Sequence, residues 1–179
     1  MKYDVIERQP IIEALFASYA TVLGKNQEGY KNHVYRIFNY CMYMSNGQCE
    51  EKYAIASVFH DIGIWTHNTF DYLKPSIELA SAYLLHSNKK EWMEEISRMI
   101  DNHHKVTQYT GDYADAVEIF RKADWADVSM SFIPFDIPDD IIKQTEAVFP
   151  YKGFHLTLVS LFARNLIQHP LKPLPMFRK

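Results

Sequence analysis

Apolar residues recur at intervals of three and four along almost the whole of this 179-residue chain. This spacing matches the period of about 3.6 residues of an amphipathic helix, whereas a half-buried strand would alternate apolar and polar residues. No stretch of the sequence shows such alternation. The pattern therefore predicts an all-α protein, a helical bundle formed by a single domain over residues 1–179.

Helix start and stop signals divide the pattern into segments. The expected helices cover residues 9–24, 29–45, 49–61, 75–86, 89–104, 113–130, 140–149 and 153–169. Asn88 and Glu91 have the spacing of a capping box, and Gly63 would allow a positive φ where the chain leaves the third helix. The helices within residues 139–168 would complete the bundle, and residues 170–179 are too rich in proline to be helical.

Charge and composition exclude several classes of protein. The formal net charge is −3 and no run of Lys and Arg stands out, which disfavours a nucleic-acid-binding surface. Cys41 and Cys49 have neither metal-type spacing nor the pattern of a disulfide framework. The first residues lack the apolar core of a signal peptide, and no stretch approaches the roughly 20 apolar residues of a membrane span. We expect a cytoplasmic protein without nucleic-acid or membrane partners. The sequence leaves open whether the chain forms a homo-oligomer.

An aspartate interrupts the apolar stripe of the sixth expected helix. Phe120 lies four residues before Asp124 and Val128 lies four after it, so the three share one face. A buried carboxylate needs a partner. The partner could be a metal ion, or a buried arginine such as Arg36 or Arg121.

Histidines also fall on inward faces. His33 shares a face with Tyr30 and Ile37, which is compatible with a metal ligand or with a hydrogen-bonded core histidine. His60 and Asp61 end the third expected helix. Adjacent helical residues point about 100° apart, but at a helix end both side chains can reach one ion.

Two further histidines end the fifth expected helix. His103 shares a face with Met99 and Ile100, and His104 lies one step round the helix. A protonated histidine is also favoured at a helix C-terminus by the helix dipole, which is the structural alternative for this pair.

Taken together, His33, His60, Asp61 and Asp124 form a mixed nitrogen and oxygen ligand set on inward helical faces. Such a set suits Mn, Fe, Ni, Co or Zn. The core of a bundle is a place where facing helices build metal sites. We expect one divalent transition metal per chain.

The order of these residues resembles that of the HD-domain superfamily of metal-dependent phosphohydrolases. "FHDIG" is similar to the central motif of that family, and the resemblance covers residues from about 28 to 130. It implies that His33, His60, Asp61 and Asp124 are the metal ligands of an all-α bundle. It also implies a phosphohydrolase or phosphodiesterase acting on a small phosphate ester or a nucleotide.

Further roles are expected around these ligands. Asp61 could orient the attacking water, His103 or His104 could donate a proton to the leaving oxygen, and positive side chains could bind phosphate. The expected catalytic residues are Asp61, His103, His104 and Lys105, and the expected substrate-binding residues are Arg36 and Arg121.

Other members of the superfamily supply the alternatives. The cyclic-dinucleotide phosphodiesterases of the HD-GYP branch are disfavoured, because no Gly-Tyr-Pro follows the motif and Ser76 stands where that branch has a histidine. With Ser76 there, no partner is expected to hold a second metal with His103 and His104. The remaining alternatives are a di-iron oxygenase or a hydratase of the HD type, and a non-catalytic metal-binding regulatory module.

Overall fold

A computed structural model describes residues 3–168, 170 and 175 of the chain. The helices are α1 (Pro10–Leu23), α2 (Gln27–Met44), α3 (Glu50–Phe59), α4 (Gly63–Thr66), α5 (Leu73–His86), α6 (Met93–Asn102), α7 (Ala114–Val128), α8 (Asp139–Val148) and α9 (Phe154–Gln168), with 3₁₀ turns η1 (Gly24–Asn26) and η2 (Lys90–Trp92). No strand occurs in the described part, so the all-α prediction is confirmed. The tail predicted for residues 170–179 lies outside the described residues, apart from positions 170 and 175.

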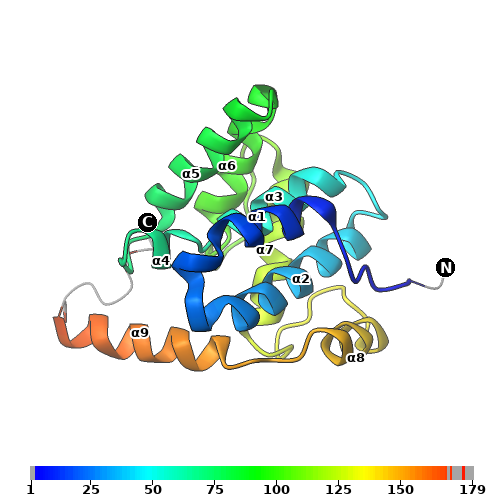
Figure 1. Cartoon of the computed structure of the whole chain (residues 1–179). Helices are drawn as coiled ribbons and strands as arrows, with labels where there is room; N and C mark the ends of the chain where they lie inside the picture. The colour runs from blue at the N-terminus through cyan, green and yellow to red at the C-terminus, as the bar shows by residue number, and fades with distance from the viewer. Residues whose placement is uncertain (1–2, 169, 171–174, 176–179) are drawn as a thin grey trace.

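Helix α2 lies at the centre and packs against α3 on one side and α7 on another (Figure 1). Helices α5 and α6 form a hairpin at the top of the view, and α9 runs along the lower left edge. The shared core contains Phe38, Ile55, Met99 and Val117, from α2, α3, α6 and α7, all with no exposed surface. Four helices therefore meet in the region to which the histidines and aspartates were predicted to point.

The two helices that precede the paired site residues each end two residues earlier than expected. Helix α3 ends at Phe59, so His60 and Asp61 lie in the turn before α4. Helix α6 ends at Asn102, so His103 and His104 also lie in a turn. His60 and His103 nevertheless keep helical backbone angles, so their side chains continue the direction set by the helix that precedes them.

Asn88 does not open a helix as a capping residue, and that expectation is wrong. Its φ is 56°, and the N–H of Lys89 donates to the carbonyl of Leu84 over 2.9 Å. These are the features of a left-handed residue just beyond a helix C-terminus. Asn88 therefore terminates α5, and η2 intervenes before α6 begins at Met93.

Gly63 does not adopt a positive φ, so the reason expected for this glycine is also wrong. A Cβ at this position would lie 2.6 Å from the Tyr72 carbonyl oxygen and 2.9 Å from Ser76 Oγ. The Gly63 N–H donates to Ser76 Oγ over 3.0 Å. Glycine is required here because α4 packs directly on the first turn of α5.

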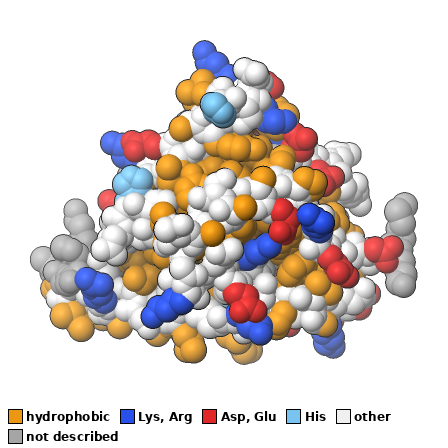
Figure 2. Space-filling view, viewed as in Figure 1, with side chains coloured by type: hydrophobic (Ala, Val, Ile, Leu, Met, Phe, Trp, Pro, Cys, Tyr) orange, Lys and Arg blue, Asp and Glu red, His pale blue; other side chains and the backbone are white. Residues whose placement is uncertain are grey.

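The surface in view mixes charges of both signs. Lys and Arg side chains are interspersed with acidic ones, and hydrophobic side chains are visible along the lower edge, where α9 lies (Figure 2). Leu156 and Val159 of α9 are 73% and 62% exposed. Among the described residues, no helix has both the length and the apolarity needed to cross a membrane.

Candidate metal centre

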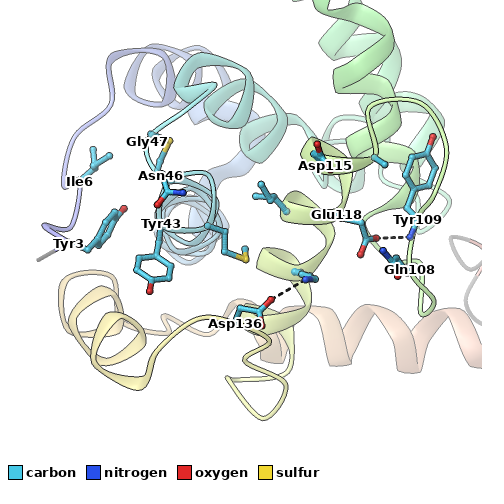
Figure 3. A pocket seen from close by; sticks show the side chains of 15 residues that line it. Tyr3, Ile6, Tyr43, Asn46, Gly47, Gln108, Tyr109, Asp115, Glu118 and Asp136 are labelled. Carbon is cyan, nitrogen blue, oxygen red and sulfur yellow. Dashed lines mark hydrogen bonds and ion pairs between the residues drawn. The ribbon is translucent and has the colours of Figure 1, made fainter. Parts of the chain in front are cut away.

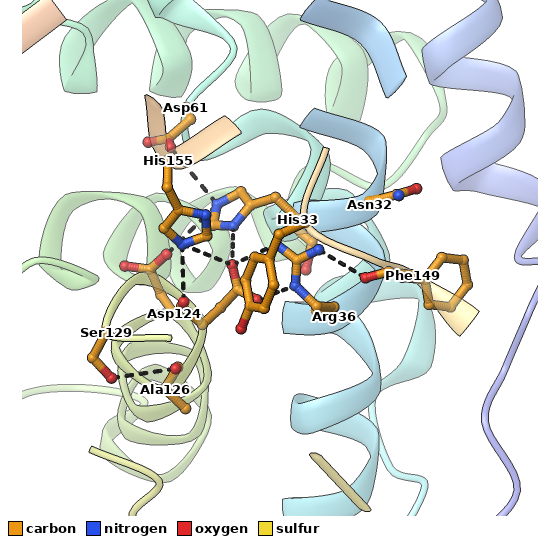
Figure 4. A network of polar contacts seen from close by, with 12 residues as sticks. Asn32, His33, Arg36, Asp61, Asp124, Ala126, Ser129, Phe149 and His155 are labelled. Carbon is orange, nitrogen blue, oxygen red and sulfur yellow. Dashed lines mark hydrogen bonds and ion pairs between the residues drawn. The ribbon is translucent and has the colours of Figure 1, made fainter. Parts of the chain in front are cut away.

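The four residues predicted as metal ligands come together in the core, and three of them, His33, Asp61 and Asp124, are labelled in Figure 4. His33 projects from the middle of α2, His60 and Asp61 follow α3, and Asp124 projects from α7. The two histidines have no exposed surface and each aspartate is 2% exposed. Burying two imidazoles and two carboxylates so completely is costly unless they find partners, and the protein supplies few.

The ligand atoms surround one point. His60 Nε2 lies 3.4 Å from Asp61 Oδ2, and His33 Nε2 lies 3.9 Å from the same oxygen. Asp124 Oδ1 lies 3.8 Å from each of these two nitrogens. One atom from each of His33, His60 and Asp61 lies within 4.8 Å of the others, as a metal site requires.

Hydrogen bonds on the far side of each imidazole orient its free nitrogen toward this point. His60 Nδ1 lies 2.7 Å from the Ser57 carbonyl and His33 Nδ1 lies 2.5 Å from Asp127, so both Nδ1 atoms are assigned as donors. The two Nε2 atoms then face each other with lone pairs, 3.0 Å apart. A shared proton or a cation is needed between them. Two nitrogens bound at a right angle, each ~2.1 Å from an ion, lie about 3.0 Å apart.

Two carboxylate oxygens without hydrogen bonds, and the shifted pKa values of the same cluster, also favour a cation at this place. Asp61 Oδ1 and Asp124 Oδ1 are buried without a hydrogen-bond partner. Burial, followed by the charges of Asp61 and Asp127, raises the pKa of Asp124 to about 8. Burial would also raise the pKa of Asp61, but His60 and His103 hold it well below its usual value. Burial lowers the pKa of His33 to about 4, so its neutral form, the form that binds metal, predominates at neutral pH.

His103 and His104 have a partner that the sequence did not reveal. One ligand atom from each of Asp61, His103 and His104 lies within 4.8 Å of the other two. His103 Nδ1 lies 2.7 Å from the Ile100 carbonyl, which leaves its Nε2 directed at Asp61 Oδ1, 3.6 Å away. The sequence analysis did not consider Asp61 as a partner for these two histidines, and the structure places it beside both groups of histidines.

His104 also contacts a tyrosine that the sequence did not single out. The Tyr72 hydroxyl lies 2.5 Å from His104 Nε2. Burial, and then the neighbouring His103, lowers the pKa of His104 well below its usual value, while burial raises the pKa of Tyr72 well above its own. At neutral pH the tyrosine is therefore the donor and the imidazole the acceptor.

Asp127 is a second site residue that the sequence analysis missed. It accepts from His33 Nδ1–H and from two nitrogens of Arg36, which also donates to the Phe149 carbonyl over 2.9 Å. Burial opposes its charge, but Arg36 and His33 hold the pKa of Asp127 far below its usual value. Arg36 has no exposed surface, so it is not placed where a substrate could reach it. Its role here is to keep Asp127 ionised behind His33.

The other two positive side chains expected near the substrate are also not available to it. Arg121 is paired within the protein, and Lys105 lies away from the opening above the candidate ligands. Arg121 donates to both carboxylate oxygens of Glu118 and to the Lys105 carbonyl, and it is 4% exposed. The side chain of Lys105 is exposed and does not line the opening above the metal centre. The structure thus fastens Arg121 to the segment that follows His104 and does not offer it to a ligand.

A cavity of about 240 Å³ opens onto the metal centre, and we call it the apolar slot. Asp61, His104 and Asp124 form its floor. Its remaining walls are Phe70, Tyr72, Trp125, Val128, Leu158, Val159 and Phe162. The last three belong to α9, which is attached to the bundle through a small apolar cluster with α4 and α5.

A larger cavity of about 880 Å³ lies elsewhere in the fold (Figure 3). Tyr3 and Tyr43 lie on one side of it and Tyr109 and Glu118 on the other. It contains none of the predicted ligands, and its charged groups are largely paired within the protein, as Glu118 is with Arg121. The smaller slot is therefore the opening that is relevant to chemistry at the metal centre.

A sequence signal existed for one of the missed residues and was absent for the others. Asp127 lies three residues after Asp124 and seven after Phe120, so it shares their inward face. Tyr72 and the α9 residues carry no such signal, because an aromatic or aliphatic residue is expected in any core. Comparisons of the chain with protein-family models, with curated proteins and with solved structures find no match.

Proposed function

We propose that the protein is a metal-dependent phosphohydrolase that acts on a small phosphate ester. The observation that carries the proposal is that His33, His60 and Asp61 each bring a ligand atom to one buried place, with Asp124 Oδ1 3.8 Å from both imidazole nitrogens. Asp61 Oδ1 and Asp124 Oδ1 accept no hydrogen bond from the protein. The order of these residues is also the order that the HD-domain resemblance assigns to metal ligands. The proposed cofactor is Mn, Fe, Ni, Co or Zn.

A divalent ion held there would polarise a phosphoryl oxygen and lower the pKa of a water molecule. The protein supplies the positioning. Asp127 fixes the orientation of His33, and Asp61, at the floor of the apolar slot, can accept a hydrogen bond from an attacking water. Trp125 Nε1 is buried in the slot wall without an acceptor, so it can donate to a phosphoryl oxygen.

The Tyr72 and His104 pair could protonate the leaving oxygen, because Tyr72 would give its proton and regain, through His104, the proton released by the attacking water. Tyr72 keeps its proton at neutral pH, and its hydroxyl lies 2.5 Å from His104 Nε2 at the edge of the slot floor. His103 is fully buried, so His104 and Tyr72 are the groups of this cluster that a substrate in the slot would meet.

Metal content tests the ligand assignment. Purified wild-type protein, reconstituted with Mn, Co or Zn, should carry bound metal by elemental analysis, and the His60→Ala, Asp61→Ala double variant should carry little. A matched control changes His86 and Asp101, which are exposed, to alanine and should retain the wild-type content. Equal metal in all three proteins would contradict the assignment.

Phosphate release tests the reaction. The metal-loaded wild-type protein should release phosphate from small monoesters without needing oxygen, and the Asp61→Asn variant should lose most of this activity. Removing a group that acts on the transferred proton typically costs about 10²–10⁴ in rate, so Tyr72→Phe should be slowed while it retains its metal.

A second candidate function follows from the second ligand group. Asp61 lies beside two pairs of histidines, His33 with His60 and His103 with His104. It could therefore be a ligand to two ions, as an HD-type di-iron oxygenase would need. Two irons per chain, together with oxygen uptake on an organic substrate and no phosphate release, would favour this candidate over the phosphohydrolase.

A further inference from the structure

The walls of the apolar slot are unlike those of a nucleotide site. Seven of its lining residues are aromatic or aliphatic, and no Lys or Arg is among them. Arg164 lines a separate hollow of about 80 Å³ that shares only Phe70 with the slot. Phosphate groups beyond the one at the metal centre would therefore meet no positive side chain within the slot.

Hydrogen-bonding capacity in the slot is equally sparse. Above the floor formed by Asp61, His104 and Asp124, Trp125 Nε1 is the only buried side-chain polar atom of the described lining that has no partner. A ribose or a polar base would lose its water there without finding replacement hydrogen bonds, which disfavours binding. A single donor beside the floor suits one acceptor oxygen close to the reacting group.

The size of the slot limits the substrate as well. Its volume of about 240 Å³ is below the roughly 300–1,000 Å³ of sites for drug-sized ligands. Phe162 and Trp125 offer ring faces or edges, and an aromatic guest can pack against such groups.

We propose that the non-reacting part of the substrate is a small, uncharged, apolar group, about one aromatic ring in size, that lies in the apolar slot beneath α9. The inference rests on the proposed function for the identity of the reacting group, a single phosphate at the metal centre. It specifies aryl or short alkyl monophosphates as substrates in preference to nucleotides.

A binding experiment isolates the apolar part from catalysis. Phenylphosphonate and methylphosphonate present the same anionic group, differ by the ring, and cannot be hydrolysed at an ester bond. By calorimetry with the metal-loaded wild-type protein, phenylphosphonate should bind about 10- to 100-fold more tightly, the range expected for burial of one ring. Adenosine monophosphate should bind no more tightly than methylphosphonate.

Variants of α9 locate the preference in the slot. Phe162→Ala should lower the phenyl-to-methyl affinity ratio by about fourfold or more, which corresponds to the loss of a methylene-sized contact or larger. Val159→Ser should lower the ratio in the same direction, and since Val159 is 62% exposed this change should be tolerated by the fold. Leu166→Ala truncates a residue of the same helix that does not line the slot and should leave the ratio unchanged.

The outcomes separate the two proposals. Equal affinity for the two phosphonates, no binding of either at millimolar concentration, or tighter binding of adenosine monophosphate would each overturn the substrate assignment. A clear preference for phenylphosphonate without phosphate release from phenyl phosphate would leave the apolar slot supported and would contradict the phosphohydrolase.

Discussion

Asp127 illustrates how much one buried side chain can control at this site. It is fully buried, and its charge is balanced by Arg36 and shared with His33. A carboxylate behind a ligating histidine fixes the tautomer and the ring orientation. The residue thus links the stability of the core to the orientation of His33, one of the candidate metal ligands.

The Asp127→Asn variant should lose both stability and metal affinity. It leaves Arg36 as a buried charge without its counter-ion, which typically costs about 3–5 kcal/mol of unfolding free energy. The weaker acceptor behind His33 should reduce metal affinity by about 10- to 100-fold. Urea unfolding of the metal-free protein and a competitive metal titration measure the two effects separately.

Asp136 provides the control for this change. It is exposed and pairs with Lys122 at 3.1 Å, so Asp136→Asn should alter stability by no more than about 0.5 kcal/mol and should not alter metal affinity. A loss of stability in Asp127→Asn with wild-type metal affinity would show that Asp127 does not orient His33.

At the scale of whole elements, close packing and one ion pair hold the segments that flank the site. Gly63 allows α4 to contact the first turn of α5. Glu118 accepts from Arg121 and from the Tyr109 N–H over 2.7 Å, while Arg121 also donates to the Lys105 carbonyl. The first contact positions Tyr72, and the second fastens to α7 the chain that follows His104.

Gly63→Ala should destabilise the contact between α4 and α5. A methyl group 2.6 Å from the Tyr72 carbonyl oxygen forces the backbone to move, and such overpacking typically costs about 1–3 kcal/mol. Gly111→Ala is the matched control, because its neighbour is the exposed-side hydroxyl end of Tyr109, which can move away. Thermal unfolding of both variants checks the expectation, and equal midpoints would contradict it.

Glu118→Gln should reveal a pH-dependent contribution from the ion pair. Burial opposes the charge of Glu118, but Arg121 and the Tyr109 N–H outweigh it and lower its pKa below 4.5. Because the folded-state pKa is lowered, this stabilisation is present above the unfolded-state value and is lost as the pH falls below 4.5 through the folded-state value. The variant should thus be less stable than wild type at pH 7, by about 1–3 kcal/mol, with the gap narrowing in acid.

Urea unfolding of both proteins between neutral and acidic pH measures this gap. Glu78→Gln supplies the control, because Glu78 is exposed and pairs only at 3.8 Å with Lys74. A gap for Glu118→Gln that stays constant as the pH falls would show that the charge of Glu118 does not contribute.

For the whole molecule, the candidate ligands come from α2, α7 and the turns after α3 and α6, so an ion held by them should stabilise the fold globally. An ion that binds only the folded state at 100 times its Kd adds about 2.7 kcal/mol. For a chain of this size that corresponds to a rise of about 5–10 °C in Tm. Calorimetry with and without a chelator should show this shift in the wild-type protein.

The same measurement on ligand variants tests where the ion acts. The His60→Ala, Asp61→Ala variant should melt at the same temperature with and without metal, whereas the His86→Ala, Asp101→Ala variant should respond as the wild type does. A full metal-dependent shift in the ligand variant would place the stabilising ion outside this centre.

The sequence by itself determined the longer helices, though not the short α4, and the inward direction of His33, His60 and Asp124, because the helical period alone decides which residues share a face. It placed helix ends less well: α3 ends at Phe59 and α6 at Asn102, because local hydrogen bonds decide where the helical pattern of bonding stops. The sequence also suggested a positive φ as the reason for Gly63, whereas the reason is the close approach of the Tyr72 backbone. A contact between two separate elements cannot be read from the local sequence pattern.

Only the tertiary structure decided which buried charges pair and what surrounds the metal centre. Arg36 pairs with Asp127, 91 positions away in sequence, and not with Asp124. Asp61 lies between two groups of histidines because the turns after α3 and α6 meet over α7. Residues of α9 wall the apolar slot although nothing in their spacing relates them to the histidines. Periodicity fixes the direction of a side chain relative to its own helix axis, whereas its partner is fixed by how separate helices pack.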